Sequence, residues 1–293
     1  MDGLILLDKP AGWTSHDAVN KLRRLVQRQK VGHLGTLDPM ATGVLPLLVG
    51  RATRLAQFFS GGEKVYRGVI RFGFATDTYD REGEPGGEAQ AVTVSREALE
   101  SLLDEFRGTI LQTPPPISAK KIGGVPAYRL ARKQQPVDLP PVEVTIHKLD
   151  LLSVSGPDAE ICVHCAPGTY IRSLAHDLGL RLGCGAHLYS LRRLASSGFT
   201  IQEASTMERL MELATAGTIE EALLPAARLL PDFPSEVVDS ATAAQIRQGR
   251  DFRISPFRAQ HHSRYVKALD ERGQLVAIGE ARLPQLYHPT VVL

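Results

Sequence analysis

One carboxylate in this sequence stands where a covalent reaction would need it. Asp38 lies in residues 33–43, HLGTLDPMATG, and is followed directly by Pro39. The proline fixes the turn after the carboxylate, and the flanking glycines permit close approach of the backbone. An isolated aspartate is usually only solvated, but a nucleophile that attacks carbon must be held rigidly against its target. The stretch therefore indicates Asp38 as the candidate nucleophile.

Other uses of a carboxylate fit the sequence less well. A glycoside hydrolase needs a second carboxyl group about 5 to 9.5 Å from the first, and the sequence offers no obvious partner. The acids of TDTYDREG, namely Asp77, Asp80 and Glu82, resemble a calcium loop. Tyr79 occupies the third ligand position, however, so the register fails. We therefore expect no metal site here.

The cysteines point to a reducing compartment. Cys162, Cys165 and Cys184 cannot form a closed set of disulfides. The first two are spaced as Cys-x-x-Cys, but EICVHC alternates like a strand and no second pair follows at zinc-ligand spacing. The N-terminus carries no basic leader, and no run of about 18 apolar residues could span a membrane. We expect a cytoplasmic protein without membrane contact.

Composition indicates an ordinary globular chain of two unequal domains. Of 293 residues, 43% are hydrophobic and 23% charged, and single cores stop growing near ~250 residues. The net charge is only +2, so RNA binding would depend on where the charges lie. One run, residues 107–137, contains basic residues and no acid; such a run is as often a solvated face as a binding segment. Its basic residues are Arg107, Lys120, Lys121, Arg129, Arg132 and Lys133.

Hydrophobic periodicity predicts a mixture of strands and helices that would position Asp38. Thr14 and Asp17 form a capping box ahead of a helix over about 17–30, which Gly32 is placed to stop. Ser95 caps a second helix that ends at Gly108. We predict strands at 3–10, 66–74, 141–154 and 159–165, and a helical or mixed segment at 43–59, broken near Pro46 and Gly50.

The second half of the chain contains an insertion and a change of composition. Residues 111–136 break every periodic pattern with three consecutive prolines and a glycine pair, which is typical of a functional or disordered loop. A helix is predicted over about 171–182, and residues 207–230 are helical in pattern. After two prolines, residues 235–293 show short apolar runs punctuated by glycine, which predicts a small all-β module.

Several motifs, in one order, resemble the bacterial tRNA pseudouridine synthases of the TruB type. The motifs are LDKPAGWTS (7–15), VGHLGTLDPMATGVLPLLVGRATR (31–54), KVYRGVIRFG (64–73), PPPISAKKIGGVPAYRLAR (114–132) and GTYIRSLAHDLG with GCGAHLYSLRR (168–193). The resemblance implies an α+β pseudouridine-synthase fold, with a mixed, largely antiparallel sheet flanked by helices. It implies a catalytic domain over 1–230 with a thumb-like insertion at about 108–137. Residues 235–293 would form a small β-barrel-like PUA domain that binds RNA.

The resemblance also implies a reaction. Such enzymes isomerise uridine to pseudouridine at position 55 in the T-loop of tRNA without cofactor or metal. The N-glycosidic bond is cut, the uracil turns, and its C5 is joined to the ribose C1′. Asp38 would attack C1′ or C6, an order of steps that the sequence leaves open. Arg172 would keep Asp38 ionised in a dry pocket, because a close guanidinium favours the charged carboxylate.

Further residues take roles from the same resemblance. The target uridine must be everted, and Tyr66 would stack on the flipped base and serve in removing the C5 proton. Tyr170 and Leu191 would line the pocket. His33 would enter the gap that the extruded nucleotide leaves. Lys9, counted among the substrate-binding residues, would brace the catalytic loop together with Pro10.

The partners and the rival functions follow from these assignments. The thumb-like insertion would close over the T-arm, and the PUA-like end would contact the acceptor-stem side of tRNA. We expect a monomer with no obligate protein partner. One alternative is a tRNA-binding or folding chaperone on the same scaffold, which would not need the carboxylate of Asp38. Two others are a synthase within a guide-RNA ribonucleoprotein and a glycoside hydrolase without cofactor.

Overall fold

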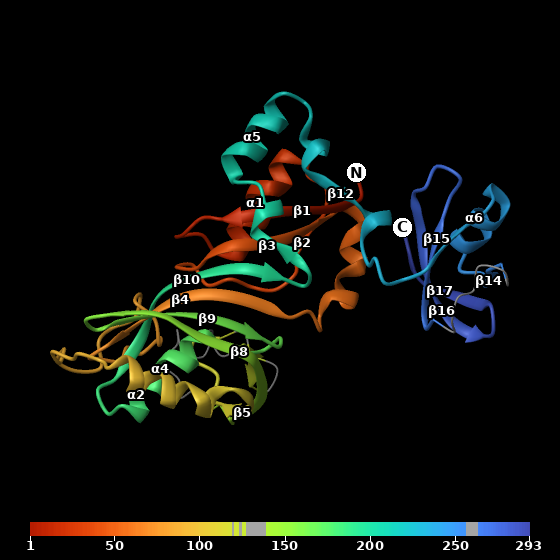
Figure 1. Ribbon diagram of the computed structural model, residues 1–293. Helices are drawn as coiled ribbons and strands as arrows, with labels where there is room; N and C mark the ends of the chain where they lie inside the picture. The colour runs from red at the N-terminus through yellow and green to blue at the C-terminus, as the bar shows by residue number, and fades with distance from the viewer. Residues whose placement is uncertain (119, 123–124, 127–138, 256–262) are drawn as a thin grey trace.

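The computed structural model describes residues 1–118, 120–122, 125–126, 139–255 and 263–293. Figure 1 shows a large module built on a long twisted sheet and a smaller C-terminal module beside it. The strands of the large sheet follow one another in the order β12 (Leu223–Pro225), β1 (Gly3–Lys9), β3 (Thr42–Val49), β10 (Ala186–Ser196), β4 (Lys64–Phe72), β9 (Asp158–Cys165), β8 (Val142–Ser155) and β5 (Gly108–Gln112).

Pairing within this sheet is antiparallel except between β3 and β10. Strand β2 (Val31–His33) pairs with β3, and β11 (Phe199–Thr200) pairs with β10. The predicted mixed, largely antiparallel sheet is therefore confirmed. The parallel step between β3 and β10 brings two distant parts of the chain together at the middle of the sheet.

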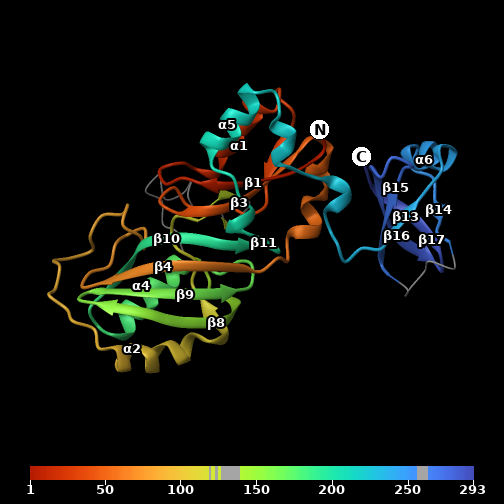
Figure 2. The same cartoon turned by 45° about the horizontal axis from the view of Figure 1, so that its top comes forward.

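Helices cover the two halves of the sheet separately. Helices α1 (Ser15–Leu25) and α5 (Met207–Thr215) lie beside the half that holds β1 and β3, while α2 (Arg96–Leu103) and α4 (Ile171–Arg181) pack on the half that holds β8 and β10 (Figures 1 and 2). Short 3₁₀ helices connect them: η1 (Gly50–Phe59), η2 (Asp104–Phe106), η3 (Ile201–Glu203), η4 (Ile219–Ala222) and η5 (Ala226–Arg228). None of the helices in these described ranges is long and apolar enough to cross a membrane.

The start of α1 is confirmed, but its predicted end is wrong. Thr14 and Asp17 form the capping box, with the Thr14 N–H donating to Asp17 Oδ2 at 2.9 Å. The helix stops at Leu25 because Gln27 and Arg28 adopt left-handed backbone angles, with φ of 53° and 60°. Gly32, expected to stop the helix, lies within β2.

The segment 43–59 is mixed, as predicted, but Pro46 does not break it. Residues 42–49 form β3, and Pro46 lies between the stretch paired with β10 and the stretch paired with β2. Its carbonyl points to that side and accepts a hydrogen bond from Leu34 N–H. The N–H and C=O of one strand residue point the same way, so Pro46 lacks only the reciprocal bond toward Leu34 and removes no bond of the ladder between β3 and β1.

Two further predictions are wrong in part. Residues 207–230 contain one α-helix that ends before Gly217 (φ 77°), after which the chain forms η4, then β12 on the edge of the sheet, then η5. The C-terminal module is not all-β. Its sheet, in the order β13 (Ser235–Val237), β15 (Tyr265–Leu269), β16 (Leu275–Leu283), β17 (Leu286–Val292) and β14 (Phe252–Arg253), carries helix α6 (Ser240–Arg247).

Asp239 explains that helix, since its carboxylate accepts from Thr242 N–H at 2.7 Å and so caps α6. The predicted strands 141–154 and 159–165 correspond to β8 and β9, and the predicted helix at 171–182 corresponds to α4. The thumb-like insertion expected at about 108–137 lies partly outside the described residues, which omit 119, 123–124 and 127–137 and with them Arg129, Arg132 and Lys133. Within it the backbone forms β5 and the hairpin of β6 (Lys121–Ile122) and β7 (Val125–Pro126).

The two modules share a hydrophobic core. Leu48 and Leu55 of the large module belong to one buried cluster with Ile278 and Leu293 of the C-terminal module. Polar contacts reinforce this packing: Arg54 Nη1 donates to the carbonyl of Val292 at 2.6 Å. The rings of Phe58, Phe233 and Tyr265 also pack against one another, with centroids 5.2 to 5.5 Å apart. The C-terminal module is therefore anchored to the large sheet by burial of apolar surface.

Lys9 ties the end of β1 to the loop that carries Asp38. Its side chain is fully buried, and Nζ donates to the carbonyls of Pro10 and Trp13 at 2.8 Å and of Pro39 at 3.3 Å. Burial lowers the pKa of Lys9 to about 8, an effect that the negative charge of Asp38 partly opposes. The ammonium group is a cross-brace that holds two loops by their backbone oxygens.

Gly43 lies where the parallel step of the sheet leaves no room for a side chain. Its φ is 103°, and a Cβ atom placed there would lie 2.2 Å from the Arg193 carbonyl oxygen. We expect Gly43→Ala to lower the free energy of unfolding by about 2 to 4 kcal/mol, measured by urea denaturation. The matched control is Gly108→Ala, where φ is also positive (84°) but a Cβ would meet open space; it should cost only about 1 kcal/mol. Equal losses in the two variants would contradict this account.

The depressed pKa of Lys9 predicts how stability depends on pH. In the unfolded chain the amine titrates near its ordinary 10.5, and in the folded protein near 8, so between these values the unfolded chain binds more protons. The free energy of unfolding should therefore rise with pH across this window, by about 1 to 3 kcal/mol from this group. Lys9→Met should lack this rise, while the exposed-site control Lys30→Met should keep it. Urea denaturation at pH 8 and pH 10.5 measures the difference, and identical profiles for wild type and Lys9→Met would refute the assignment.

Candidate active site

A cavity of about 1010 Å³ opens between the two halves of the sheet. Its walls come from the start of α1, the loop between β2 and β3, strands β4 and β10, and the segment that leads into α4. Six of the residues singled out from the sequence line it: His33, Asp38, Tyr66, Tyr170, Arg172 and Leu191. Lys9 does not line the cavity but lies behind the loop that carries Asp38.

The loop around Asp38 is held from both sides. Ser15, the first residue of α1, accepts from Leu37 N–H at 2.8 Å and donates its hydroxyl to the Leu37 carbonyl at 3.1 Å. Gly12 N–H donates to the Pro39 carbonyl at 2.8 Å, beside the contact from Lys9. These bonds hold the backbone on either side of Asp38, while its side chain remains 33% exposed toward the cavity.

Arg172 provides the opposite charge for Asp38. Its Nη2 donates to Asp38 Oδ1 at 3.2 Å, and its Nε lies 2.9 Å from Asp38 Oδ2, an ion-pair contact whose angle is not that of a hydrogen bond. The Arg172 side chain is only 5% exposed. A guanidinium stays protonated at any ordinary pH, so Arg172 places a buried positive charge directly against the Asp38 carboxylate.

The remaining donors of Arg172 are also engaged. Its Nη1 donates to the carbonyl of Thr78 at 3.0 Å, and its Nη2 donates to the carbonyl of Ile117 at 2.9 Å. Both acceptors lie outside α4, one in the loop after β4 and one at the start of the insertion. The orientation of the guanidinium is therefore fixed by the backbone of two other segments as well as by Asp38.

Asp80 is a site residue that the sequence analysis missed. Its carboxylate is buried, with Oδ2 lying 3.5 Å from Arg172 Nη1 and Oδ1 accepting from the Thr78 hydroxyl at 2.7 Å. Arg172 thus lies between two carboxylates, although the sequence offered no obvious partner for Asp38. The available signal was the spacing Thr-x-Thr-x-Asp in TDTYD, because threonine hydroxyls at this spacing hydrogen-bond a local loop. The Thr76 hydroxyl indeed donates to the Asp80 carbonyl at 2.7 Å.

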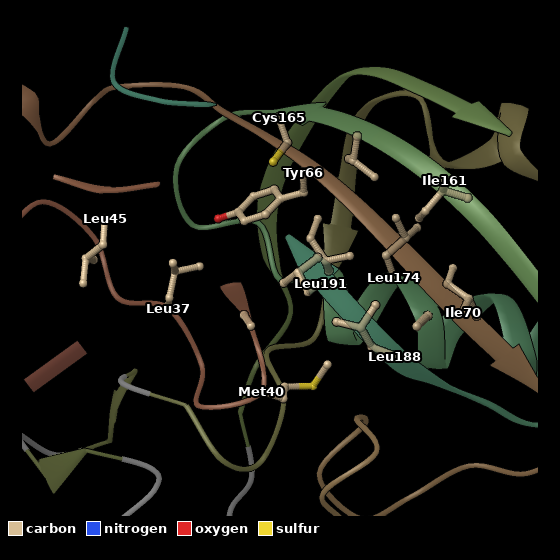
Figure 3. Close-up of a cluster of buried hydrophobic side chains, with 14 of the residues drawn as sticks. Leu37, Met40, Leu45, Tyr66, Ile70, Ile161, Cys165, Leu174, Leu188 and Leu191 are labelled. Carbon is tan, nitrogen blue, oxygen red and sulfur yellow. The ribbon is translucent and has the colours of Figure 1, made fainter. Parts of the chain in front are cut away.

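Tyr66 projects from β4 into the same region. Figure 3 shows its hydroxyl directed toward the side on which Leu37 and Leu45 lie. Burial raises the pKa of Tyr66 above its ordinary value of 10, and the nearby Arg193 opposes this shift. The phenol is therefore neutral at physiological pH.

Arg193 is the second residue that the sequence analysis missed. It is fully buried, and its guanidinium donates to three carbonyls, of Val44 at 2.7 Å, Gly35 at 3.1 Å and Thr36 at 3.3 Å. It thereby orders the first part of the Asp38 loop from strand β10. Sequence reasoning had no signal for this role, because an arginine in an alternating strand is usually exposed.

The other cavity residues offer apolar and aromatic surface. Burial is the main cause that lowers the pKa of His33, which favours a neutral ring, and raises the pKa of Tyr170. The backbone of Tyr170 is fixed by Gln112, which accepts from its N–H at 2.8 Å and donates to its carbonyl at 3.0 Å. Leu191 is buried on β10, close to the position that pairs with Tyr66 (Figure 3). Among the described residues, the arrangement is the Asp38–Arg172 ion pair, with Lys64 as a further cationic side chain, in a cavity whose other walls include apolar and aromatic side chains.

No group of three His, Cys, Asp or Glu side chains in the described part of the chain is arranged to hold a metal ion. The rejected calcium loop is instead the segment that presents Asp80 to Arg172. Cys162 and Cys165 lie on β9 as predicted, and burial raises the pKa of the Cys165 thiol to about 11. That thiol is accordingly protonated and unsuited to metal binding or nucleophilic attack.

Comparison with known proteins shows similarity to tRNA pseudouridine synthases along the chain. Residues 23–171 match the model of the TruB family pseudouridylate synthase N-terminal domain, and residues 172–231 match that of the tRNA pseudouridylate synthase B C-terminal domain. A protein of Solibacter usitatus (strain Ellin6076) named tRNA pseudouridine synthase B is 58% identical over 293 residues, all of both chains. The protein of the same name from Aquifex aeolicus (strain VF5) is 40% identical and covers 96% of each chain.

Solved structures extend the likeness to three dimensions. A chain in the crystal structure of a Cbf5-Nop10-Gar1 complex superposes with a TM-score of 0.69 at 26% identity, over 97% of this chain and 79% of that one. A chain in the structure of an H/ACA RNP bound to a substrate RNA containing 2′-deoxyuridine shares the fold, with a TM-score of 0.70 at 24% identity over 99% of this chain and 84% of that one. The expected pseudouridine-synthase fold with a PUA-like C-terminal module is thereby confirmed. The chain belongs to the TruB family of pseudouridylate synthases.

Proposed function

We propose that this protein isomerises uridine to pseudouridine in tRNA, and that its target is position 55 in the T-loop. The observation that carries the proposal is the ion pair of Asp38 and Arg172 at the wall of the cavity. The relatives named tRNA pseudouridine synthase B support tRNA as the substrate class. The choice of nucleotide within tRNA follows from the motif resemblance and needs the experiment below.

The proposed reaction uses the carboxylate of Asp38 as nucleophile. Attack at C1′ would release the uracil as an anion, whereas attack at C6 would tether the ring to the enzyme; in either case the N1–C1′ bond breaks and the C5–C1′ bond forms. Asp38 then leaves as carboxylate, C5 gives up its proton and N1, freed from the ribose, takes one up, which restores the conjugated ring and the original charge. Arg172 stabilises the ionised carboxylate before attack and after release.

The apolar and aromatic parts of the cavity wall suit a base taken out of its stack. We assign Tyr66, which lines the cavity, to stack on the everted uracil and to exchange a proton with it through its hydroxyl. Tyr170 and Leu191 complete the apolar surroundings. A volume of about 1010 Å³ exceeds that of one base, which leaves room for the flanking backbone. We assign His33 to the RNA side of the cavity, filling the gap in the loop.

The remaining parts of the proposal concern partners and organisation. We assign residues 1–230 to catalysis and residues 235–293 to binding on the acceptor-stem side of tRNA, with the insertion at about 108–137 closing over the T-arm. We also propose that the protein acts as a monomer in the cytoplasm. Since the two modules share a core, the RNA-binding assignment of the second module concerns its outer surface.

An unmodified tRNA transcript tests the substrate assignment. Incubated with catalytic amounts of the protein, the transcript should acquire a single pseudouridine at position 55, which carbodiimide labelling followed by primer extension locates. A transcript with cytidine at that position is the control and should stay unmodified. Pseudouridine only at another nucleotide would reject the site assignment, and none at any nucleotide would reject the activity.

The nucleophile is tested by Asp38→Asn. The amide keeps the shape of the side chain but is not a nucleophile, so the rate of pseudouridine formation should fall at least ~10⁴-fold. The dissociation constant for tRNA should change less than about tenfold, because Asp38 contributes one carboxylate to a large interface. The exposed Asp232 supplies the control, and Asp232→Asn should retain the wild-type rate. Undiminished isomerisation by Asp38→Asn would overturn the mechanism. Full tRNA-folding activity together with an absence of catalysis in the wild type would favour the chaperone alternative.

A further inference from the structure

A second pair of side chains links α4 to the loop that holds Arg172. The ring of Tyr79 stacks on the imidazole of His176, with centroids 3.8 Å apart and planes within 10°. Tyr79 stands between Thr78 and Asp80, both of which contact the Arg172 guanidinium. His176 follows Arg172 by four residues on α4, so the two side chains leave the same face of the helix. One face of α4 thus contacts the loop of residues 78–80 at two points, through Arg172 and through His176.

The backbone of Tyr79 needs support of this kind. Its φ is 66°, in the left-handed region that a bulky aromatic residue rarely adopts. Such a conformation persists only where the surroundings impose it. The backbone bonds of Tyr79, its N–H to the Thr76 carbonyl at 3.2 Å and its carbonyl from Leu188 N–H at 3.0 Å, hold the turn itself. The stack on His176 is the side-chain contact with α4 that holds the strained residue against the helix.

The left-handed turn decides where two acceptors of Arg172 lie. If Tyr79 left its left-handed conformation, the Thr78 carbonyl and the Asp80 carboxylate on either side of it would move. The carbonyl accepts a hydrogen bond from Arg172 Nη1 at 3.0 Å, and the carboxylate lies 3.5 Å from the same atom. Arg172 would then be fixed only by Asp38 and by the Ile117 carbonyl, both on its other side. Its donors toward Asp38 would no longer be aligned by contacts on both sides of the guanidinium.

We propose that Tyr79 and His176 form a positioning pair that aligns Arg172 with Asp38 for catalysis. The inference deepens the proposed function and rests on it, since it assigns the pair to the same isomerisation. Neither side chain lines the cavity, so the pair acts through Arg172 and not on the RNA. Its effect should therefore appear in the rate of the chemical step and not in the affinity for tRNA.

The test compares Tyr79→Ala, His176→Ala and their double variant with Tyr79→Phe, which keeps the ring. Each alanine variant should lower the single-turnover rate of pseudouridine formation by about 10- to 100-fold, because a small misplacement of a catalytic group costs this much. The Kd for tRNA should stay within about threefold of wild type. The rate of the double variant should lie within about threefold of the rate of the slower single variant, since the two rings act as one unit. Tyr79→Phe should keep the rate within about threefold.

Two controls separate positioning from loss of stability. Tyr79→Gly removes the ring while permitting φ of 66°, so it serves if Tyr79→Ala fails to fold; it should be as slow as the alanine variant. Leu213→Ala removes a buried side chain of α5 away from the cavity. At an equal loss of Tm, it should keep the wild-type rate. Wild-type rates in Tyr79→Gly and His176→Ala, independent multiplicative losses in the double variant, or an equal loss in Leu213→Ala would each overturn the proposal.

A crystal structure of His176→Ala distinguishes this inference from the proposed function. The contact of Arg172 Nη1 with the Thr78 carbonyl should be lost and the separation of Arg172 Nε from Asp38 Oδ2 should exceed 2.9 Å. Unchanged contacts would overturn the positioning role whatever the activity. A wild-type protein that makes no pseudouridine would instead refute the proposed function, and the variant structure would still decide whether the pair aligns Arg172.

Discussion

The site depends on one buried guanidinium. Removing the charge of Arg172 from water costs on the order of several kcal/mol, and only good partners on every side offset that cost. The partners are the carboxylates of Asp38 and Asp80 and the carbonyls of Thr78 and Ile117. They come from three loops on both sides of the central strands, so burial of one cation requires those loops to meet. The architecture that brings them together is the architecture that creates the cavity.

Local chemistry in the sequence predicted much of this arrangement. The capping box of Thr14 and Asp17 starts α1 where expected because it is a contact between residues three apart. The alternation in residues 66–72 and 159–165 predicted β4 and β9 because half-buried strands have a period of two. The rigid mount of Asp38 was apparent from Pro39 and its glycines. Motif resemblance then supplied what local patterns do not contain: the pairing with Arg172, which follows Asp38 by 134 residues.

The misses share a cause, which is interaction between distant segments. Asp80 acts through its contact with Arg172, which follows it by 92 residues. Arg193 acts through hydrogen bonds to the carbonyls of Val44 and Thr36, which precede it by 149 and 157 residues. Residues 223–225 became a strand because the edge of β1 was free to pair with them, which overrode their helical pattern. Helix α1 ended early for a backbone reason, the left-handed angles of Gln27 and Arg28, that side-chain periodicity does not encode.

The common core of the two modules has a mechanical consequence. Leu48, Leu55, Ile278 and Leu293 belong to one buried cluster, so the C-terminal sheet cannot move as a hinged unit without exposing these side chains to water. The distance from the outer surface of that sheet to Asp38 is therefore fixed. Under the proposed function, an RNA bound both at that surface and in the cavity would have to match this fixed length, and a helical arm that is too long or too short would not bring a nucleotide to Asp38.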